Sequence, residues 1–246
     1  MYLSEWQNNS FSNHLNKNEI HVWLLDIFKI SKSENDFDNI LNFEEKERKN
    51  KYYFLKDKIT FSTVRGILKL LLSNYLNKNV NQIILKFNNY GKPFLDDTLN
   101  DKLKFNISHS KDYGIIVFNY FDDIGIDIEF IKSDLVTQDI ASNYFSEYER
   151  NSLFELSKDE QQKTFFDIWT RKEAYIKAKG MGLSIPLNSF DVDTNSNNPR
   201  IIRSEFELDA KNWHLYNLLI SEEYRSAIAN FGSKKKIKKY YITEKF

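Results

Sequence analysis

The sequence contains no cysteine, and this absence excludes several kinds of site at once. Disulfide bonds, zinc–thiolate sites, iron–sulfur clusters and cysteine nucleophiles all require the thiol group. Any metal ion that the protein binds must therefore be held by oxygen or nitrogen ligands.

Excess charge of one sign and long apolar runs are also missing. The chain of 246 residues carries 35 basic and 35 acidic side chains, whereas a nucleic-acid-binding protein more often has a basic excess. Its apolar runs are far shorter than the roughly 18–20 residues of a membrane span. Residues 1–18 are polar and show no signal-peptide pattern. We therefore expect a cytoplasmic protein that binds neither nucleic acid nor membrane.

Apolar residues are plentiful enough for a large core. Hydrophobic residues make up 41% of the chain and aromatic residues 15%, and the length allows one large domain or two small ones. The spacing of apolar residues predicts both helices and strands, so we expect a mixed fold. The predicted helices cover residues 44–58, 61–76 and 162–179, and the predicted strands cover 19–30, 104–108, 113–120, 124–130, 190–193, 201–208, 214–220 and 225–231.

One segment of the sequence is partly repeated further along the chain, and we call this similarity the internal echo. Residues 105–120 align without gaps on residues 216–231, with four identities and similar apolar spacing. The echo favours two similar halves, each containing a hairpin and a long helix. The polar pair Ser108 and His109 is not repeated.

The strand predicted at 124–130 carries two carboxylates, Asp127 and Glu129. Side chains alternate along a strand, so both carboxylates point to the same face. They repel each other unless a cation or a proton lies between them, and all-oxygen ligation suits Mg²⁺. The alternative is the solvent-facing edge of an ordinary amphipathic strand.

A second group of candidates lies on the last predicted helix. Trp169, Glu173 and Lys177 are spaced four residues apart and share one helix face. Glu173 and Lys177 could form an ordinary surface ion pair, which contributes only a few tenths of a kcal/mol, or they could carry chemistry. Trp169 is expected to pack the helix.

Two further segments could bind phosphate. Ser108 and His109 end a predicted strand, where they can donate hydrogen bonds to phosphate oxygens. Neighbouring strand residues face opposite ways, so this pair is poorly placed as nucleophile and base; a hydrogen-bonded turn is the alternative. Lysines and arginines also cluster at residues 46–58, which is either a solvated helix face or an anion site.

Taken in order, the motifs GKPFL, FNISHS, GIDIE and WTRKEAYIKAKGMGL closely resemble the Sfp-type 4′-phosphopantetheinyl transferases, most strongly over residues 90–192. The resemblance implies an α+β fold of two similar α/β halves with pseudo-twofold symmetry. Each half would be an antiparallel sheet packed on a long helix. The halves would cover residues 1–122 and 123–246, with the active site in the cleft between them.

The resemblance also implies an activity, namely Mg²⁺-dependent transfer of 4′-phosphopantetheine from coenzyme A to a serine of an apo acyl or peptidyl carrier protein. Adenosine 3′,5′-bisphosphate would be released. Residue by residue it assigns Mg²⁺ ligation to Asp127, Glu129 and Glu173, catalysis to Glu173 and Lys177, and coenzyme A binding to Lys46, Lys49, Lys92, Ser108, His109 and Lys177.

Two alternatives to this activity are a non-catalytic relative that binds carrier proteins and a metal-dependent phosphohydrolase. The non-catalytic relative is disfavoured because all four residues to which the resemblance assigns metal binding or catalysis are present, namely Asp127, Glu129, Glu173 and Lys177. The second would need another metal cluster or an activating histidine near the acids, and the sequence shows none. We expect a monomer, with fatty-acid, polyketide and nonribosomal-peptide carriers all open as partners.

Overall fold

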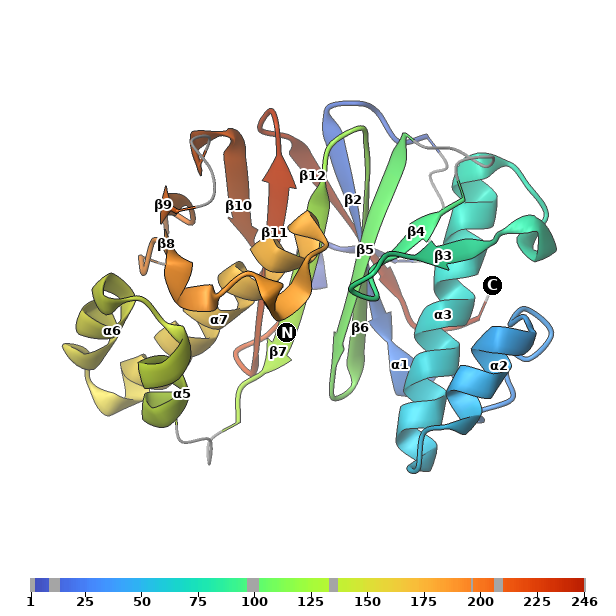
Figure 1. Cartoon of the computed structure of the whole chain (residues 1–246). Helices are drawn as coiled ribbons and strands as arrows, with labels where there is room; N and C mark the ends of the chain where they lie inside the picture. The colour runs from blue at the N-terminus through green and yellow to red at the C-terminus, as the bar shows by residue number, and fades with distance from the viewer. Residues whose placement is uncertain are drawn as a thin grey trace. The chain divides into compact units, whose positions relative to one another are not determined.

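In the computed structural model of the protein, the chain forms two compact units, each with one long helix and its own sheets (Figure 1). Among the described residues no helix is both long and apolar enough to cross a membrane. The described parts of the N-terminal unit lie within residues 3–87, 93–121 and 236–245, and those of the C-terminal unit within 88–92 and 122–235. Over the whole chain the structure describes residues 3–8, 14–96, 102–132, 137–195, 197–205 and 210–245.

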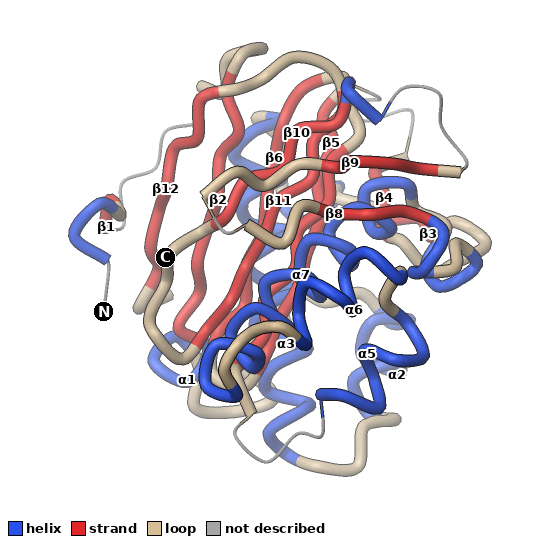
Figure 2. Tube along the Cα trace, turned by 90° about the vertical axis from the view of Figure 1, so that its left-hand side faces the viewer, coloured by secondary structure: helices blue, strands red, loops and turns tan. Residues whose placement is uncertain are grey.

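The N-terminal unit is built on a sheet of five strands in the order β1-β12-β2-β6-β5. Strand β12 lies between β1 and β2 and runs parallel to both (Figure 2). The prediction of an antiparallel sheet is therefore wrong for this unit, because the local pattern of a last strand does not show which strand it will join. The strands are β1 (Gln7–Asn8), β2 (Glu19–Asp26), β5 (Leu103–Ser110), β6 (Tyr113–Tyr120) and β12 (Lys236–Ile242), and a second small sheet pairs β3 (Leu85–Phe87) with β4 (Pro93–Leu95).

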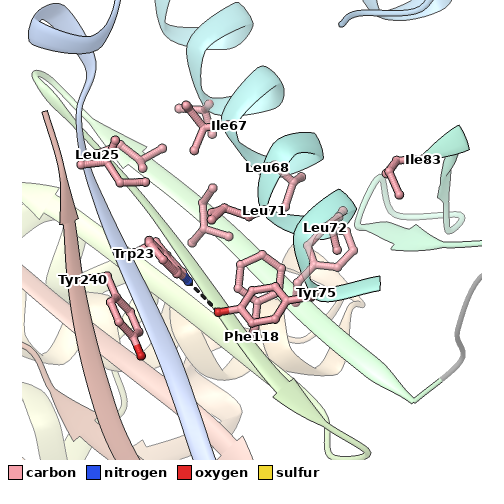
Figure 3. Packing of buried hydrophobic residues seen from close by; sticks show 14 of the residues in the cluster. Trp23, Leu25, Ile67, Leu68, Leu71, Leu72, Tyr75, Ile83, Phe118 and Tyr240 are labelled. Carbon is pink, nitrogen blue, oxygen red and sulfur yellow. Dashed lines mark hydrogen bonds between the residues drawn. The ribbon is translucent and has the colours of Figure 1, made fainter. Parts of the chain in front are cut away.

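Helix α3 (Leu55–Leu76) packs on this sheet through the apolar face that its spacing predicts. Leu71 and Tyr75 lie over Trp23 of β2, whose indole Nε1 donates to the Tyr75 hydroxyl at 2.9 Å (Figure 3). The helix predicted at 44–58 is in fact two elements. Helix α2 (Phe43–Asn50) ends before residue 51 and α3 starts at Leu55. Likewise the strand predicted at 19–30 ends at Asp26, which caps the short helix α1 (Ile27–Ile30).

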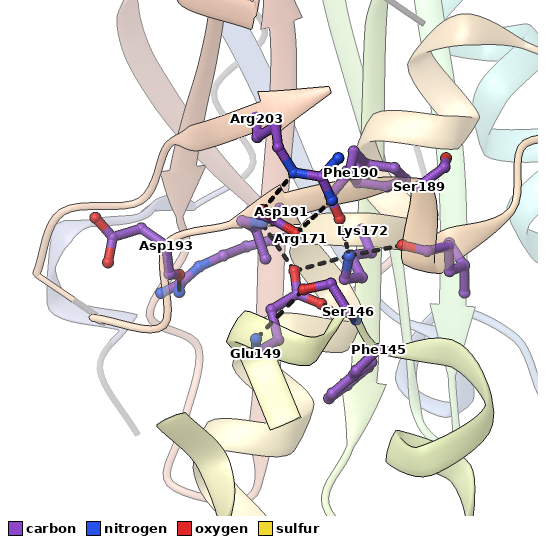
Figure 4. A network of polar contacts seen from close by, with 12 residues as sticks. Phe145, Ser146, Glu149, Arg171, Lys172, Ser189, Phe190, Asp191, Asp193 and Arg203 are labelled. Atoms are coloured by element: carbon purple, nitrogen blue, oxygen red, sulfur yellow. Dashed lines mark hydrogen bonds and ion pairs between the residues drawn. The ribbon is translucent and has the colours of Figure 1, made fainter. Parts of the chain in front are cut away.

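The C-terminal unit has a three-stranded antiparallel sheet, β10-β11-β7, with the long helix α7 against it. Helix α6 is fastened to α7 by a fully buried ion pair between Glu149 and Lys172, 2.7 Å long (Figure 4). Lys172 also donates to the backbone oxygens of Leu187 and Phe190. The elements are β7 (Ile124–Phe130), α5 (Thr137–Tyr144), α6 (Glu147–Phe154), α7 (Lys158–Lys179), β8 (Phe190–Val192), β9 (Ile201–Ser204), β10 (Trp213–Asn217) and β11 (Tyr224–Phe231).

The two units repeat one order of elements, which is strand, 22-residue helix and hairpin. Helices α3 and α7 both end at a left-handed residue, Asn77 and Gly180. In each unit a lysine at the fifteenth position of the long helix pairs with the third residue of the preceding short helix: Lys69 with Glu45, and Lys172 with Glu149. The sequence echo therefore extends beyond the hairpins, β5–β6 and β10–β11, that first showed it.

Candidate active site

Strand β7 presents Gly125, Asp127 and Glu129 to helix α7, because side chains alternate along the strand. The contact is unusually close at Gly125, where an added Cβ would lie 2.0 Å from the backbone oxygen of Ala174. Asp127 is 2% exposed. The alternative of a solvent-facing strand edge is therefore wrong for Asp127.

Lys177 of α7 reaches across to the strand and pairs with Asp127. Its Nζ lies 2.5 Å from Asp127 Oδ1, and the lysine side chain stays 30% exposed while the carboxylate is nearly covered. The Ser226 hydroxyl of β11 donates to the backbone oxygen of Asp127 at 2.7 Å, which fixes the strand on its other side. The contact of Lys177 with Asp127 links the helix to the strand, which a surface ion pair within α7 would not do.

The charged groups of the site shift the pKa values of Glu173 and Lys177. Burial raises the pKa of Glu173, and the nearby carboxylate of Asp127 raises it further, against the opposing effect of Lys177. Burial alone would lower the pKa of Lys177, but Asp127, Glu173 and Glu129 outweigh it and raise that pKa. All three predicted carboxylates thus act electrostatically on one ammonium group.

A metal ion was predicted for these carboxylates. Among the described residues, no three His, Asp or Glu side chains stand together in a ready-made metal cluster. The donor set nevertheless fits Mg²⁺, which prefers carboxylate oxygens and usually keeps several waters. The Asp127 carboxylate lies near enough to oppose the ionisation of Glu173, and a divalent cation would relieve that repulsion.

Helix α7 holds Glu173 and Lys177 in place through its packing and its end. Trp169 stacks on Phe165 with ring centroids 5.9 Å apart, which confirms that it packs the helix. The helix ends at Gly180 in the left-handed conformation that favours glycine.

Lys92, predicted to bind phosphate, lies at this same helix end. Its Nζ donates to the backbone oxygens of Ala178 at 2.8 Å and Ile124 at 3.4 Å. Asn88 adds a bond from Nδ2 to the oxygen of Gly180. The segment therefore ties the end of α7 to the start of β7.

The other predicted coenzyme A residues lie in the N-terminal unit. Ser108 and His109 occupy adjacent positions of β5, the first buried and the second exposed, so they face opposite ways as expected. Lys46 is half-buried on α2. Lys49 differs: it is 3% exposed, and its Nζ lies 2.7 Å from Asp38 Oδ1 and donates to the backbone oxygen of Glu34. This engagement argues against a phosphate-binding role for Lys49.

Two arginines, Arg48 of the predicted basic cluster and Arg65 of α3, were assigned no role in coenzyme A binding. The guanidinium groups of Arg48 and Arg65 both lie over the rings of Phe61 and Phe87, at 5.5–5.7 Å, beside a small pocket. Arg65 is 4% exposed, and its Nε and one terminal nitrogen have no hydrogen-bond partner among the described residues; the carboxylate of Glu45 is 3.7 Å away. A basic cluster in the sequence gave no sign of which member would be buried beside a pocket.

Gly125 was also missed. A glycine inside a predicted strand was the available signal, since such a residue often marks a close approach of backbone.

Comparison with known protein families gives two matches that together cover most of the chain. A model described as 4′-phosphopantetheinyl transferase, N-terminal, matches residues 31–120. A model of the 4′-phosphopantetheinyl transferase superfamily matches residues 123–229 and so includes every residue of the strand–helix site except Lys92.

Two curated proteins and one solved structure are also similar to parts of this chain. The 4′-phosphopantetheinyl transferase HetI of Nostoc sp. is 30% identical over 215 residues, covering 87% of this chain and 88% of that protein. The 4′-phosphopantetheinyl transferase Sfp of Bacillus subtilis is 36% identical over 166 residues, covering 66% and 71%. A crystal structure of a holo-(acyl-carrier-protein) synthase from Bacillus anthracis, in complex with CoA (3′,5′-ADP), matches 45% of this chain and 96% of its own at 24% identity and a TM-score of 0.38.

Proposed function

The chain belongs to the 4′-phosphopantetheinyl transferase superfamily and transfers phosphopantetheine from coenzyme A to carrier proteins, and from this premise we propose where it does so. The transfer site is the group Asp127, Glu129, Glu173 and Lys177. One observation carries the proposal: Lys177 of α7 reaches the buried Asp127 of β7, so residues 50 positions apart in the chain form one charged site.

Asp127, Glu129 and Glu173 would hold the Mg²⁺ that the family generally uses. When bound, the ion would neutralise charge on the phosphate oxygens of the transferring group. Carboxylates on a rigid strand and a rigid helix suit this task, because they need little rearrangement to receive a cation.

Glu173 and Lys177 would act on the protons of the reaction. Glu173 would accept the proton of the attacking serine hydroxyl, directly or through a water. Lys177 would stabilise or protonate the departing oxygen of adenosine 3′,5′-bisphosphate, where a cation is most useful. The raised pKa of Lys177 keeps its ammonium charged before the substrate arrives.

We propose that the coenzyme A phosphates are bound mainly from the N-terminal unit. Ser108, His109 and Lys46 keep the roles predicted for them. Arg65, which lies with Arg48 beside the small pocket, is better placed for a phosphate than Lys49. Two of its nitrogen atoms have no hydrogen-bond partner in the part of the chain that the structure describes, while the ammonium of Lys49 is engaged.

Lys92 would have a structural role, because it links the end of α7 to the start of β7. It would contact phosphate only if its ammonium left the two backbone oxygens to which it now donates.

We further propose that the two units are the similar halves of the family fold. The repeated order of elements and the repeated lysine–glutamate pairs support this. The carboxylates of the proposed site belong to the C-terminal half only. In the N-terminal half the strand that corresponds to β7 is β2, and it carries Trp23 and Leu25 in the core instead.

The variant Glu173→Gln tests the proposed site. It should bind coenzyme A within about threefold of the unchanged protein in isothermal titration, while its kcat for carrier modification falls by about 10²–10⁴-fold, the usual contribution of a general base. Glu155→Gln, at an exposed position after α6, is the matched control and should keep full turnover. Near-normal turnover of Glu173→Gln would refute the role.

A further inference from the structure

The last residue of each hairpin is followed by a residue in the left-handed region. In the C-terminal unit this residue is Gly232, with φ of 88°, and its N–H donates to the backbone oxygen of Asn212 at 2.9 Å. In the N-terminal unit the equivalent residue is Phe121, with φ of 76°, and its N–H donates to the oxygen of Lys102 at 2.7 Å. The same turn is thus built once with glycine and once with phenylalanine.

Phenylalanine is a poor choice for this turn. Glycine adopts a positive φ without strain, whereas a bulky residue there is an outlier. The ring of Phe121 does not compensate through burial, because the residue is 48% exposed. Strained backbone of this kind is found most often where a side chain is needed for binding or catalysis.

The ring of Phe121 lines a cavity of about 750 Å³ in the N-terminal unit. This volume lies within the range of about 300–1,000 Å³ that is typical of small-molecule sites. Tyr120 lines the same cavity, and the Lys17 ammonium lies 5.4 Å from the centre of the Phe121 ring. The cavity therefore offers an aromatic surface with a cation beside it.

The described lining is rich in positive charge. Lys17, Lys102 and Lys236 all contribute to it, and all three are exposed. Glu19 is the one acid among the described lining residues, and its carboxylate already accepts from Asn16 and lies 3.0 Å from Lys238 Nζ. The balance favours an anionic ligand.

The cavity is separate from the predicted coenzyme A residues of the same unit. Lys102 and Tyr120 lie at one end of the β5–β6 hairpin and Ser108 and His109 near the other. Six residues of strand span about 20 Å, which is too far for one phosphate group to contact both.

We propose that this cavity binds a nucleotide polyphosphate, with the base on the Phe121 ring and the phosphates among the three lysines. Stacking on an exposed aromatic ring accepts any base, and lysines serve phosphates as point charges. A concave site of this volume suits a small molecule better than a protein surface or a membrane.

Titration calorimetry with ATP tests the proposal. ATP should bind once per chain when one equivalent of coenzyme A is already present, and Phe121→Gly should weaken that binding at least fivefold, in line with the loss of one stacked base. The same variant should keep or raise the melting temperature, because it relieves the strained turn, and should keep full transferase activity. Phe121→Asn, which tolerates a positive φ, should behave in the same way.

Tyr53→Ala, which removes an exposed ring elsewhere in the unit, is the control and should bind ATP normally. The proposal is overturned if ATP does not bind the coenzyme A-loaded protein up to millimolar concentration. It is also overturned if Phe121→Gly binds ATP as well as the unchanged protein, or if pyrophosphate binds as tightly as ATP. Loss of transferase activity in Glu173→Gln with ATP binding retained would separate this site from the transfer site.

Discussion

Replacing Gly125 with alanine tests whether the close approach of β7 to α7 brings the proposed transfer site together. The new Cβ would lie 2.0 Å from the oxygen of Ala174 and 2.4 Å from the nitrogen of Ala178, where ordinary contacts begin at 3.4 Å. Both contacts are with backbone, so no side chain can rotate away. The strand and helix must separate by about 1.4 Å, the difference between the contact distances.

That separation acts on the pair that joins the two elements. Lys177 Nζ and Asp127 Oδ1 are 2.5 Å apart, and the carboxylates on the strand would move away from Glu173 with it. Overpacking of this kind costs about 1–3 kcal/mol of unfolding free energy, and a misplacement of about 1 Å at a catalytic group costs about 10²-fold in rate. We expect Gly125→Ala to show both losses.

The assay is kcat for modification of an apo carrier at saturating coenzyme A, with urea unfolding measured on the same preparations. Leu71→Ala is the control, because it removes a buried side chain in the other unit and should cost about 2–5 kcal/mol. Its kcat should stay within about threefold of the unchanged protein. A folded Gly125→Ala with normal kcat would refute the reasoning.

Two further predictions concern stability. Lys172→Met alone should lower the free energy of unfolding by about 3–5 kcal/mol, because it leaves the fully buried carboxylate of Glu149 without its ammonium partner. The double variant Glu149→Gln, Lys172→Met should cost less in urea unfolding, and an equal or larger cost would contradict the explanation. Burial lowers the pKa of His21 to about 4 from 6.5, with Lys238 adding to the shift, so stability present above pH 6.5 should be lost as pH falls toward 4, by about 3 kcal/mol. His21→Gln should flatten this part of the stability profile, and an unchanged slope would show that His21 does not cause it.

The sequence predicted which candidate residues share a face, but not which of them are in contact. Alternation along the strand placed Asp127 and Glu129 on one face of β7, and helical spacing placed Glu173 and Lys177 on one face of α7. Which residue would meet which depends on how β7 packs against α7, and that contact is not visible in either local pattern. The ion pair of Lys177 with Asp127, rather than with the glutamate four residues before it, came from the structure.

In the fold too, elements defined by a local pattern could be predicted, whereas pairings between distant segments could not. Strands 113–120 and 124–130 have the predicted limits, because each has a continuous local pattern. The parallel place of β12 beside β2 joins the two ends of the chain, so no local pattern could show it. The engagement of Lys49 was hidden for a related reason: its partners lie 11 to 15 residues earlier in an irregular loop, while its own segment shows only a charged helix.

The mass of an apo carrier protein after incubation with this chain, coenzyme A and Mg²⁺ tests the central claim most directly. The account predicts that the carrier gains the mass of one phosphopantetheine, and that it gains nothing with Asp127→Asn or when Mg²⁺ is chelated. An unmodified carrier with the unchanged chain, or full modification by Asp127→Asn, would contradict it.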